Sequence, residues 1–251
     1  MADTIAVLSL KGGTGKTTTV RTLADVFRQS GLKVLTIDLD PQGNLSDYFD
    51  VPRDAAPTVA DVLAGDAKVK EAVHDGVMPS SLNLAEVERA LSGKMGRELV
   101  LKKALKDVRK AYDVVLIDCP PALGLLTING LVAADHALIS SEAQYFALQG
   151  VNGAIEVVDQ VREYYNDELA LLGVLLNIAD MRTTHSRDAY TQLQEVFGEK
   201  VFASVIRSSI AYAESAEKAL SILEYRPDLG ADYLALADEV LARIGREQAL
   251  H

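Results

Sequence analysis

A glycine-rich segment near the start of the sequence has the composition of a phosphate-binding loop. Closely spaced glycines let a backbone curl so that its N–H groups converge on an anion at the start of a helix. A lysine at the end of such a loop adds positive charge for the β- and γ-phosphates, and the next hydroxyl can ligate Mg²⁺. The residues of this predicted nucleotide site are Lys11, Gly12, Gly13, Thr14, Gly15, Lys16, Thr17 and Thr18.

Three carboxylates follow apolar runs and are candidate ligands for a metal ion or a water molecule. Asp38 and Asp40 come after the second run and Asp118 after the third. Carboxylates at the carboxyl ends of parallel strands lie where such sheets bind their ligands. We expect Asp38 and Asp118 to hold Mg²⁺ together with Thr17, and Asp40 to orient a water for in-line attack on the γ-phosphate. Alternatively, Asp38 only caps the turn after its strand.

The elements that position these residues are predicted by short apolar runs that alternate with helical patterns. The runs are nearly continuous, which is typical of strands buried on both faces of a parallel sheet. We predict strands at 5–10, 34–37, 114–117, 137–139, 171–178 and 201–206, and helices at 17–29, 98–111, 148–165 and 233–244. The stretch 50–97 is interpreted as short helices and loops. This series predicts a doubly wound α/β fold of the P-loop NTPase class, with a mostly parallel sheet, helices on both faces and a single domain over 1–251.

Composition and charge restrict the possible partners. The chain of 251 residues is 49% hydrophobic and 24% charged, as expected of a globular protein. Its 25 basic and 36 acidic residues give a net charge of −11, so any binding to a polyanion must be local. One cysteine allows no internal disulfide, and charges or turn residues interrupt every apolar run before it reaches the roughly 18 residues that span a bilayer. We expect a soluble, cytoplasmic protein.

One basic segment is the best candidate for binding nucleic acid. Residues 94–110 contain seven basic and two acidic residues, a local charge of +5. The predicted helix places an apolar stripe on one face and Lys102, Lys106, Arg109 and Lys110 on or near the outer face. The alternative is an ordinary solvated helix face.

These motifs together resemble those of the ParA/MinD family of P-loop ATPases. Leu10 stands where a strict Walker A motif has glycine, and the pair Lys11 and Lys16 is similar to the deviant Walker A motif of that family. The segments 38–44 and 118–129, which read DLDPQGN and DCPPALGLLTIN, resemble its two switch regions. The resemblance implies that Lys11 reaches the phosphates of a partner subunit and that Asp40 is the hydrolytic aspartate.

The resemblance covers about residues 4–245 and is greatest to the Soj-like chromosomal ParA proteins. It implies that Asn177 contacts adenine and that Arg207 lies in the base-contacting loop, where the family usually has a proline. Ala211 stands where Soj-like proteins often have a DNA-binding arginine. The phosphate loop starts close to the first residue, which favours the short form without a helix-turn-helix extension ahead of it.

The resemblance implies a Mg²⁺-dependent ATPase that dimerises around two ATP molecules and binds nonspecific DNA at the nucleoid. Such a protein drives chromosome or plasmid partition, and a ParB-like activator stimulates its weak basal activity. No stable association with a membrane is expected. One alternative is a ParA-like ATPase that positions a protein cargo. A MinD-like membrane-cycling ATPase would need a basic amphipathic C-terminal helix, whereas 238–251 mixes acids with bases. A third class is an enzyme such as a cobyrinate amidase or a nitrogenase iron protein, although the latter needs two cluster cysteines.

Overall fold

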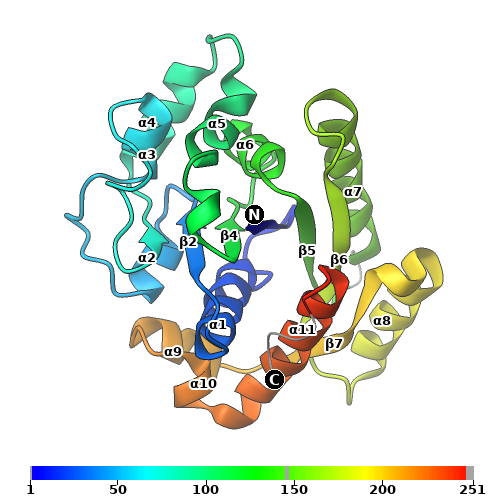
Figure 1. Cartoon of the computed structure of the whole chain (residues 1–251). Helices are drawn as coiled ribbons and strands as arrows, with labels where there is room; N and C mark the ends of the chain where they lie inside the picture. Colours follow the sequence, from blue (N-terminus) through cyan, green and yellow to red (C-terminus); the bar gives the residue numbers. More distant parts are fainter. Residues whose placement is uncertain (1, 145–146, 247–251) are drawn as a thin grey trace.

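The computed structural model describes residues 2–144 and 147–246, which fold around one parallel sheet (Figure 1). The strand order is β3-β2-β4-β1-β5-β6-β7, and neighbouring strands are parallel throughout. The strands are β1 (Asp3–Leu8), β2 (Val34–Asp38), β3 (Val77–Met78), β4 (Val114–Asp118), β5 (His136–Glu142), β6 (Ala170–Ala179) and β7 (Val201–Arg207). The predicted doubly wound α/β fold is confirmed.

Helices cover both faces of the sheet and enclose two cores (Figure 1). Side chains of α3 to α8 form the core on one face, and those of α1, α2 and α9 to α11 form the core on the other. The helices are α1 (Lys16–Gln29), α2 (Asn44–Tyr48), α3 (Val59–Ala64), α4 (Asn83–Leu91), α5 (Val100–Leu105), α6 (Leu125–Ala133), α7 (Ala147–Tyr164), α8 (Thr184–Phe197), α9 (Ala211–Glu217), α10 (Ile222–Tyr225) and α11 (Pro227–Arg243), with 3₁₀ turns at Arg97–Leu99, Arg109–Ala111 and Gly198–Lys200. None of the described helices is both long and apolar enough to cross a membrane.

The strand register brings the predicted functional segments to one edge of the sheet. Asp38 at the end of β2 lies opposite Asp118 at the end of β4, and Val7 of β1 lies opposite Asp118 on its other side. The loop that follows β1 therefore starts beside Asp118, and Asp38 lies one strand further along the same edge. This is the carboxyl edge, where open parallel sheets bind ligands.

The predicted helix at 98–111 is wrong in its extent. Only α5 is α-helical, and 3₁₀ turns lie on both sides of it. The Ala2 amide donates to the Arg109 carbonyl over 3.2 Å, and the Arg109 guanidinium donates to the Ala2 carbonyl over 2.6 Å. Because these contacts tie the segment to the start of β1, the chain leaves the helical path before reaching β4.

Two smaller differences concern strands. The first strand ends at Leu8, so Ser9 and Leu10 belong to the phosphate loop and not to the strand predicted at 5–10. The stretch 50–97 contains the two-residue strand β3. So short a strand leaves no apolar run that sequence periodicity could detect.

Candidate nucleotide and metal site

The glycine-rich loop joins β1 to the N-terminus of α1 and forms one wall of a pocket. Residues 12–18 line this pocket. Gly13 and Gly15 have φ angles of 75° and 79°, in the left-handed region that favours glycine. No side chain caps the first turn of α1, and that turn contains no acidic residue. The backbone N–H groups at the start of this helix therefore fit an anion held in the loop.

A second reason for glycine at position 15 is the close approach of Asn177. A Cβ atom on Gly15 would lie 2.6 Å from the Asn177 amide nitrogen. That nitrogen donates to the hydroxyls of Thr19 (3.2 Å) and Ser140 (3.3 Å). Asn177 lines the pocket, and its side chain forms hydrogen bonds with neighbouring protein groups. The structure thus places Asn177 against the phosphate loop, and its contact with adenine stays a prediction.

Thr17 and Asp118 form the part of the site that fits a metal ion. The Thr17 hydroxyl donates to Oδ2 of Asp118 over 2.7 Å. The other carboxylate oxygen, Oδ1, is buried and has no hydrogen-bond partner among the described residues. A buried carboxylate oxygen without a donor beside a hydroxyl matches the oxygen ligands that Mg²⁺ prefers. These two side chains are therefore suited to hold Mg²⁺.

Asp38 is also buried, but its carboxylate is already bound by protein donors. Its Oδ2 accepts from the amide (2.9 Å) and hydroxyl (2.7 Å) of Ser46, and its Oδ1 accepts from the Asp40 amide (3.1 Å). The contact with Asp40 is the turn-capping alternative considered from sequence. Asp38 thus stabilises the segment between β2 and α2 and lies beside Asp118, whereas direct ligation of metal by Asp38 stays a prediction.

Burial perturbs both carboxylates. Burial, together with the negative charge of Asp38, raises the pKa of Asp118 to about 8 against the opposing effects of Thr17 and Lys16. Burial likewise raises the pKa of Asp38 to about 6, against the hydrogen bonds from Ser46. A divalent cation at this site would stabilise the charged forms of both groups.

These shifts predict how stability depends on pH in the absence of nucleotide and metal. Both carboxyls have folded-state pKa values above their ordinary value of 3.8, so the stability that they contribute is present below pH ~4 and is lost as pH rises through about 6 and about 8. We expect the free energy of unfolding to fall across this range by up to about 1.4 kcal/mol per pH unit for each carboxyl. Urea denaturation at each pH checks this, and Asp118→Asn should flatten the upper part of the curve. An unchanged slope in that variant would contradict the assignment.

Ser46 was not singled out from the sequence, although it connects the metal site to β3. Its hydroxyl donates to Asp38 and accepts from the Ser80 amide over 2.9 Å. No motif marks this serine, because its partners lie 8 and 34 residues away. The only local sign of this role in the sequence is a short polar residue in the first turn of α2.

Ser46→Ala should destabilise the fold. The variant removes one donor to a buried carboxylate and one acceptor for a backbone N–H, so we expect a loss of about 1–3 kcal/mol in the free energy of unfolding. Ser46→Thr keeps the hydroxyl and should retain most of that stability. Urea denaturation of both variants near pH 7 provides the measurement, and equal stability of the alanine and threonine variants would exclude the role of the hydroxyl.

The remaining predicted catalytic residues differ in where they point. Lys16 is buried and lines the pocket. Asp40 is half-buried and also lines the pocket, and its Oδ1 accepts from the Gln42 amide over 3.0 Å. Lys11 is exposed and does not line the pocket, unlike all of residues 12–18. Its ammonium donates instead to Gln144 Oε1 over 2.5 Å.

Arg207 is not brought to the pocket. Its Nε donates to both carboxylate oxygens of Asp232 (3.1 and 2.8 Å), and its guanidinium also binds the Asp228 carbonyl. These partners belong to α11, against which β7 packs. The Arg207 side chain is thus directed to α11, and its contact with the nucleotide stays a prediction.

The wall opposite the phosphate loop comes from elements that sequence reasoning did not assign to the site. It is formed by α9 and the residues before it, by α2 and by one residue of α11; the lining residues are Tyr48, Ser209, Tyr212, Ala213, Ala216, Glu217 and Tyr233. The Tyr48 hydroxyl lies 2.6 Å from the Ser215 hydroxyl and joins α2 to α9. Since α2 and α9 are far apart in sequence, no local motif could predict this wall.

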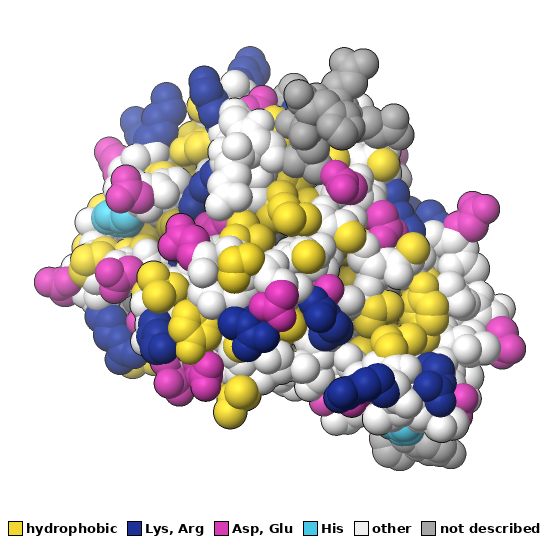
Figure 2. All heavy atoms as spheres, turned by 90° about the horizontal axis from the view of Figure 1, so that it is seen from below, with side chains coloured by type: hydrophobic (Ala, Val, Ile, Leu, Met, Phe, Trp, Pro, Cys, Tyr) yellow, Lys and Arg dark blue, Asp and Glu magenta, His cyan; other side chains and the backbone are white. Residues whose placement is uncertain are grey.

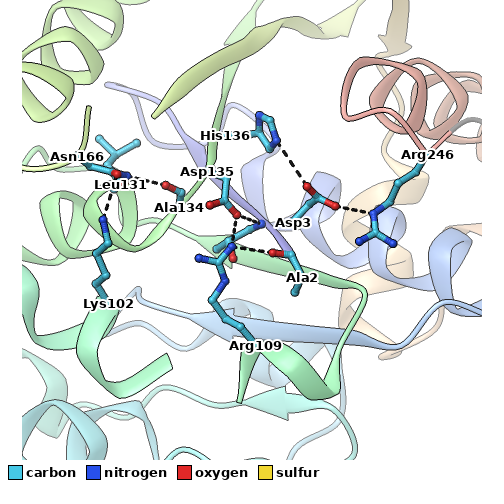
Figure 3. A network of polar contacts seen from close by, with 11 residues as sticks. Ala2, Asp3, Lys102, Arg109, Leu131, Ala134, Asp135, His136, Asn166 and Arg246 are labelled. Atoms are coloured by element: carbon cyan, nitrogen blue, oxygen red, sulfur yellow. Dashed lines mark hydrogen bonds and ion pairs between the residues drawn. The ribbon is translucent and has the colours of Figure 1, made fainter. Parts of the chain in front are cut away.

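The basic segment is only partly free to bind a polyanion. Figure 3 shows that Lys102 donates to the Asn166 side chain (3.1 Å), and that Arg109 binds Asp135. Both cations are half-buried and belong to a polar network at the amino edge of the sheet, so they are already engaged within the chain, and their contact with nucleic acid stays a prediction. Lys106 and Lys110 are exposed.

On the face formed by α9, α10 and α11, the basic side chains of the described residues form no continuous area (Figure 2). Figure 2 views the molecule from below and shows Lys and Arg side chains interspersed with acidic and hydrophobic ones. The net charge of −11 agrees with this pattern. Lys106 and Lys110 of the basic segment therefore stay the candidates for nucleic-acid contact.

Comparison with known proteins places the chain among nucleotide-binding ATPases. The AAA domain family matches residues 2–171. The chromosome-partitioning ATPase Soj of Treponema pallidum is 36% identical over 254 residues, which cover 98% of this chain and 100% of that protein. The chain belongs to the ParA/Soj family of ATPases. The resemblance found in the sequence motifs is thus confirmed over nearly the whole length.

Solved structures of the same fold bear different functional names. McdA from Cyanothece, without nucleotide, is 27% identical with a TM-score of 0.88 and covers 96% of this chain and 100% of its own. Cobyrinic acid a,c-diamide synthase from Mycobacterium smegmatis, with bound ADP and magnesium, is 36% identical with a TM-score of 0.79 and covers 87% and 92%. Because one fold supports several functions, the function of this ParA/Soj-family member has to be argued from its site.

Proposed function

We propose that this protein is a Mg²⁺-dependent ATPase, built as a single domain over 1–251, that dimerises around two ATP molecules and partitions DNA. The proposal rests on the different positions of the two loop lysines. Lys16 lines the pocket, whereas Lys11 is the one residue of 11–18 that does not. A cation on the phosphate loop that faces away from its own phosphate pocket is suited to serve a second subunit.

The phosphates and the metal are held by groups at the carboxyl edge of the sheet. The loop amides and the Lys16 ammonium bind the phosphate oxygens. Thr17 and Asp118 hold Mg²⁺, with Asp38 beside them. When bound, the ion offsets the negative charge that develops on the triphosphate. This arrangement leaves the protein chiefly the tasks of positioning and charge neutralisation.

Hydrolysis is assigned to Asp40 and to Lys11 of the opposite subunit. The Asp40 carboxylate lines the same pocket as the loop, and one of its oxygens is already held by the Gln42 amide. The other oxygen is available to orient the attacking water. Lys11 from the partner subunit would neutralise charge on the leaving phosphate, as an arginine finger does. Because that cation arrives only in the dimer, basal turnover should be weak.

The partners of this ATPase are inferred from the relative named a chromosome-partitioning ATPase. We assign it nonspecific DNA as a surface, a ParB-like protein as activator and the nucleoid in the cytoplasm as its location, without stable membrane association. Plasmid partition fits the same chemistry. A protein cargo is the first alternative and a MinD-like membrane cycle the second.

The activity test separates these proposals from a small-molecule enzyme, which the name of the diamide synthase structure suggests. ATP hydrolysis is measured with the protein alone, with DNA and a ParB-like protein, and with cobyrinic acid plus an ammonia donor. We expect slow turnover alone and stimulation only by DNA with the activator. Hydrolysis that depends on cobyrinic acid would assign the site to amidation instead, and Lys16→Ala provides the background rate.

DNA retention should depend on the exposed lysines of the basic segment. Reversing the charge of Lys106 and Lys110 together should weaken ATP-dependent DNA binding and reduce the slope of log K against log salt by about 0.9 for each lost phosphate contact. Reversing Lys68 and Lys70, which are also exposed, changes the net charge equally and is the matched control. If both double variants shift binding to the same extent, the basic segment has no specific role.

A further inference from the structure

The ammonium group of Lys11 has a defined position within its own subunit. Its Nζ lies 2.5 Å from Oε1 of Gln144, which follows β5 on the carboxyl edge of the sheet. Two backbone hydrogen bonds hold Gln144: its amide donates to the Glu142 carbonyl (2.8 Å), and its carbonyl accepts from the Ala147 amide (2.9 Å). The glutamine is therefore fixed from both sides when it accepts from the lysine.

The surroundings direct Lys11 toward this loop. Lys11 and Gln144 line a small, mainly apolar hollow between the phosphate loop and α7, separate from the nucleotide pocket. Leu10 is packed against α7, where a Cβ on Gly153 would lie 2.5 Å from Leu10 Cδ1. Since Leu10 anchors the backbone next to Lys11, the lysine side chain is aimed at the loop after β5 and not at its own phosphates.

We infer that Gln144 holds Lys11 within its own subunit, and that this contact competes with the transfer of Lys11 to the triphosphate of the partner subunit. The inference rests on the proposed in-trans role of Lys11. Gln144 is a positioning residue and touches neither nucleotide nor metal. A neutral amide oxygen suits the task, because it orients an ammonium group less strongly than a carboxylate would and so releases it more readily.

Dimer formation breaks this contact twice, because a symmetric dimer assembles from two subunits that each contain one copy of it. Losing one neutral hydrogen bond in the monomer shifts an equilibrium by roughly 5-fold, so losing both should tighten the ATP-bound dimer by on the order of 25-fold. An ion pair in place of the neutral contact should shift the equilibrium in the opposite direction.

Dimerisation is measured by sedimentation with ATP and Mg²⁺ in an Asp40→Ala background, which keeps the nucleotide intact. Gln144→Ala should tighten the dimer and Gln144→Glu should weaken it, while monomer affinity for ATP stays unchanged. Gln149→Ala, which removes an exposed glutamine of α7, is the matched control. The reverse order of the two Gln144 variants would show that the residue acts across the dimer, and equal dimerisation in all three would exclude any competition.

A second measurement does not require a dimer. The rate at which an acetylating reagent modifies Lys11 in the nucleotide-free protein is followed by mass spectrometry, with exposed Lys106 as internal reference. Gln144→Ala should accelerate modification of Lys11 and Gln144→Glu should slow it. Unchanged rates would overturn the proposed contact. If the rates change but the Asp40→Ala protein stays monomeric with ATP, the contact stands, whereas competition and the proposed dimer are both wrong.

Discussion

Lys16→Ala is expected to lower affinity for Mg²⁺-ATP on the order of 100-fold. The ammonium is buried in the pocket wall, and hydrogen bonds between charged groups in such a setting contribute about 1.5–3 kcal/mol each. Alanine also leaves nothing to offset the charge of the β- and γ-phosphates. The direct measurement is calorimetric titration with a non-hydrolysable ATP analogue in the presence of Mg²⁺.

Two controls keep this result specific. Lys33→Ala removes an exposed lysine that precedes β2 at the opposite edge of the sheet and should bind the analogue normally. Circular dichroism of the Lys16→Ala protein should match that of the parent, because a lysine at the start of α1 contributes little to either core. Normal affinity in a folded Lys16→Ala protein would contradict the assignment of the loop.

The parallel sheet and the phosphate loop could be predicted because their physical signals are local. A strand buried on both faces is almost continuously apolar, and a loop that binds phosphate needs glycines at close spacing. The carboxylates were found for the same reason, since parallel strands end at a common edge. The register that places Asp38 opposite Asp118 then follows from the sheet.

The parts that escaped prediction depend on contacts between distant segments. The basic segment was expected to be one helix with its cations on or near an outer face, but Arg109 is bound to Asp135 and Ala2, and Lys102 to Asn166. Helical periodicity carries no information about such partners. The pocket wall built by α9 escaped for the same reason, because the residues that form it have no motif of their own.

Proteins of this fold bear different functional names because the fold itself determines only part of the functional site. The loop, the metal ligands and the sheet edge bind the triphosphate in any member, so they distinguish none of the proposed functions. We propose that the features that distinguish them lie where the loop would meet a second molecule. In this chain these features are Lys11, Gln144, which accepts a hydrogen bond from Lys11, and Asp40, which lines the pocket.

Asp40→Asn is expected to slow ATP hydrolysis about 10²–10³-fold and to leave ATP binding intact. Asparagine keeps an oxygen that accepts from the Gln42 amide, so the turn after β2 should persist. The carboxylate charge that orients the water is lost, and positioned acid–base groups contribute about 10²–10⁴-fold to rates. Single-turnover hydrolysis and nucleotide affinity, measured on the same preparation, separate the two effects.

The matched control for this prediction is Asp47→Asn. Asp47 also lines the pocket, but its carboxylate is paired with Arg53 over 2.8 Å, so its charge is already engaged. It should hydrolyse ATP at nearly the parent rate. Because the Asp40 variant retains its nucleotide, light scattering with ATP should show it as a lasting dimer, whereas the parent returns to monomer as ATP is consumed. If Asp40→Asn turned over normally, or if Asp47→Asn were equally slow, the water would have to be oriented by another group in the pocket.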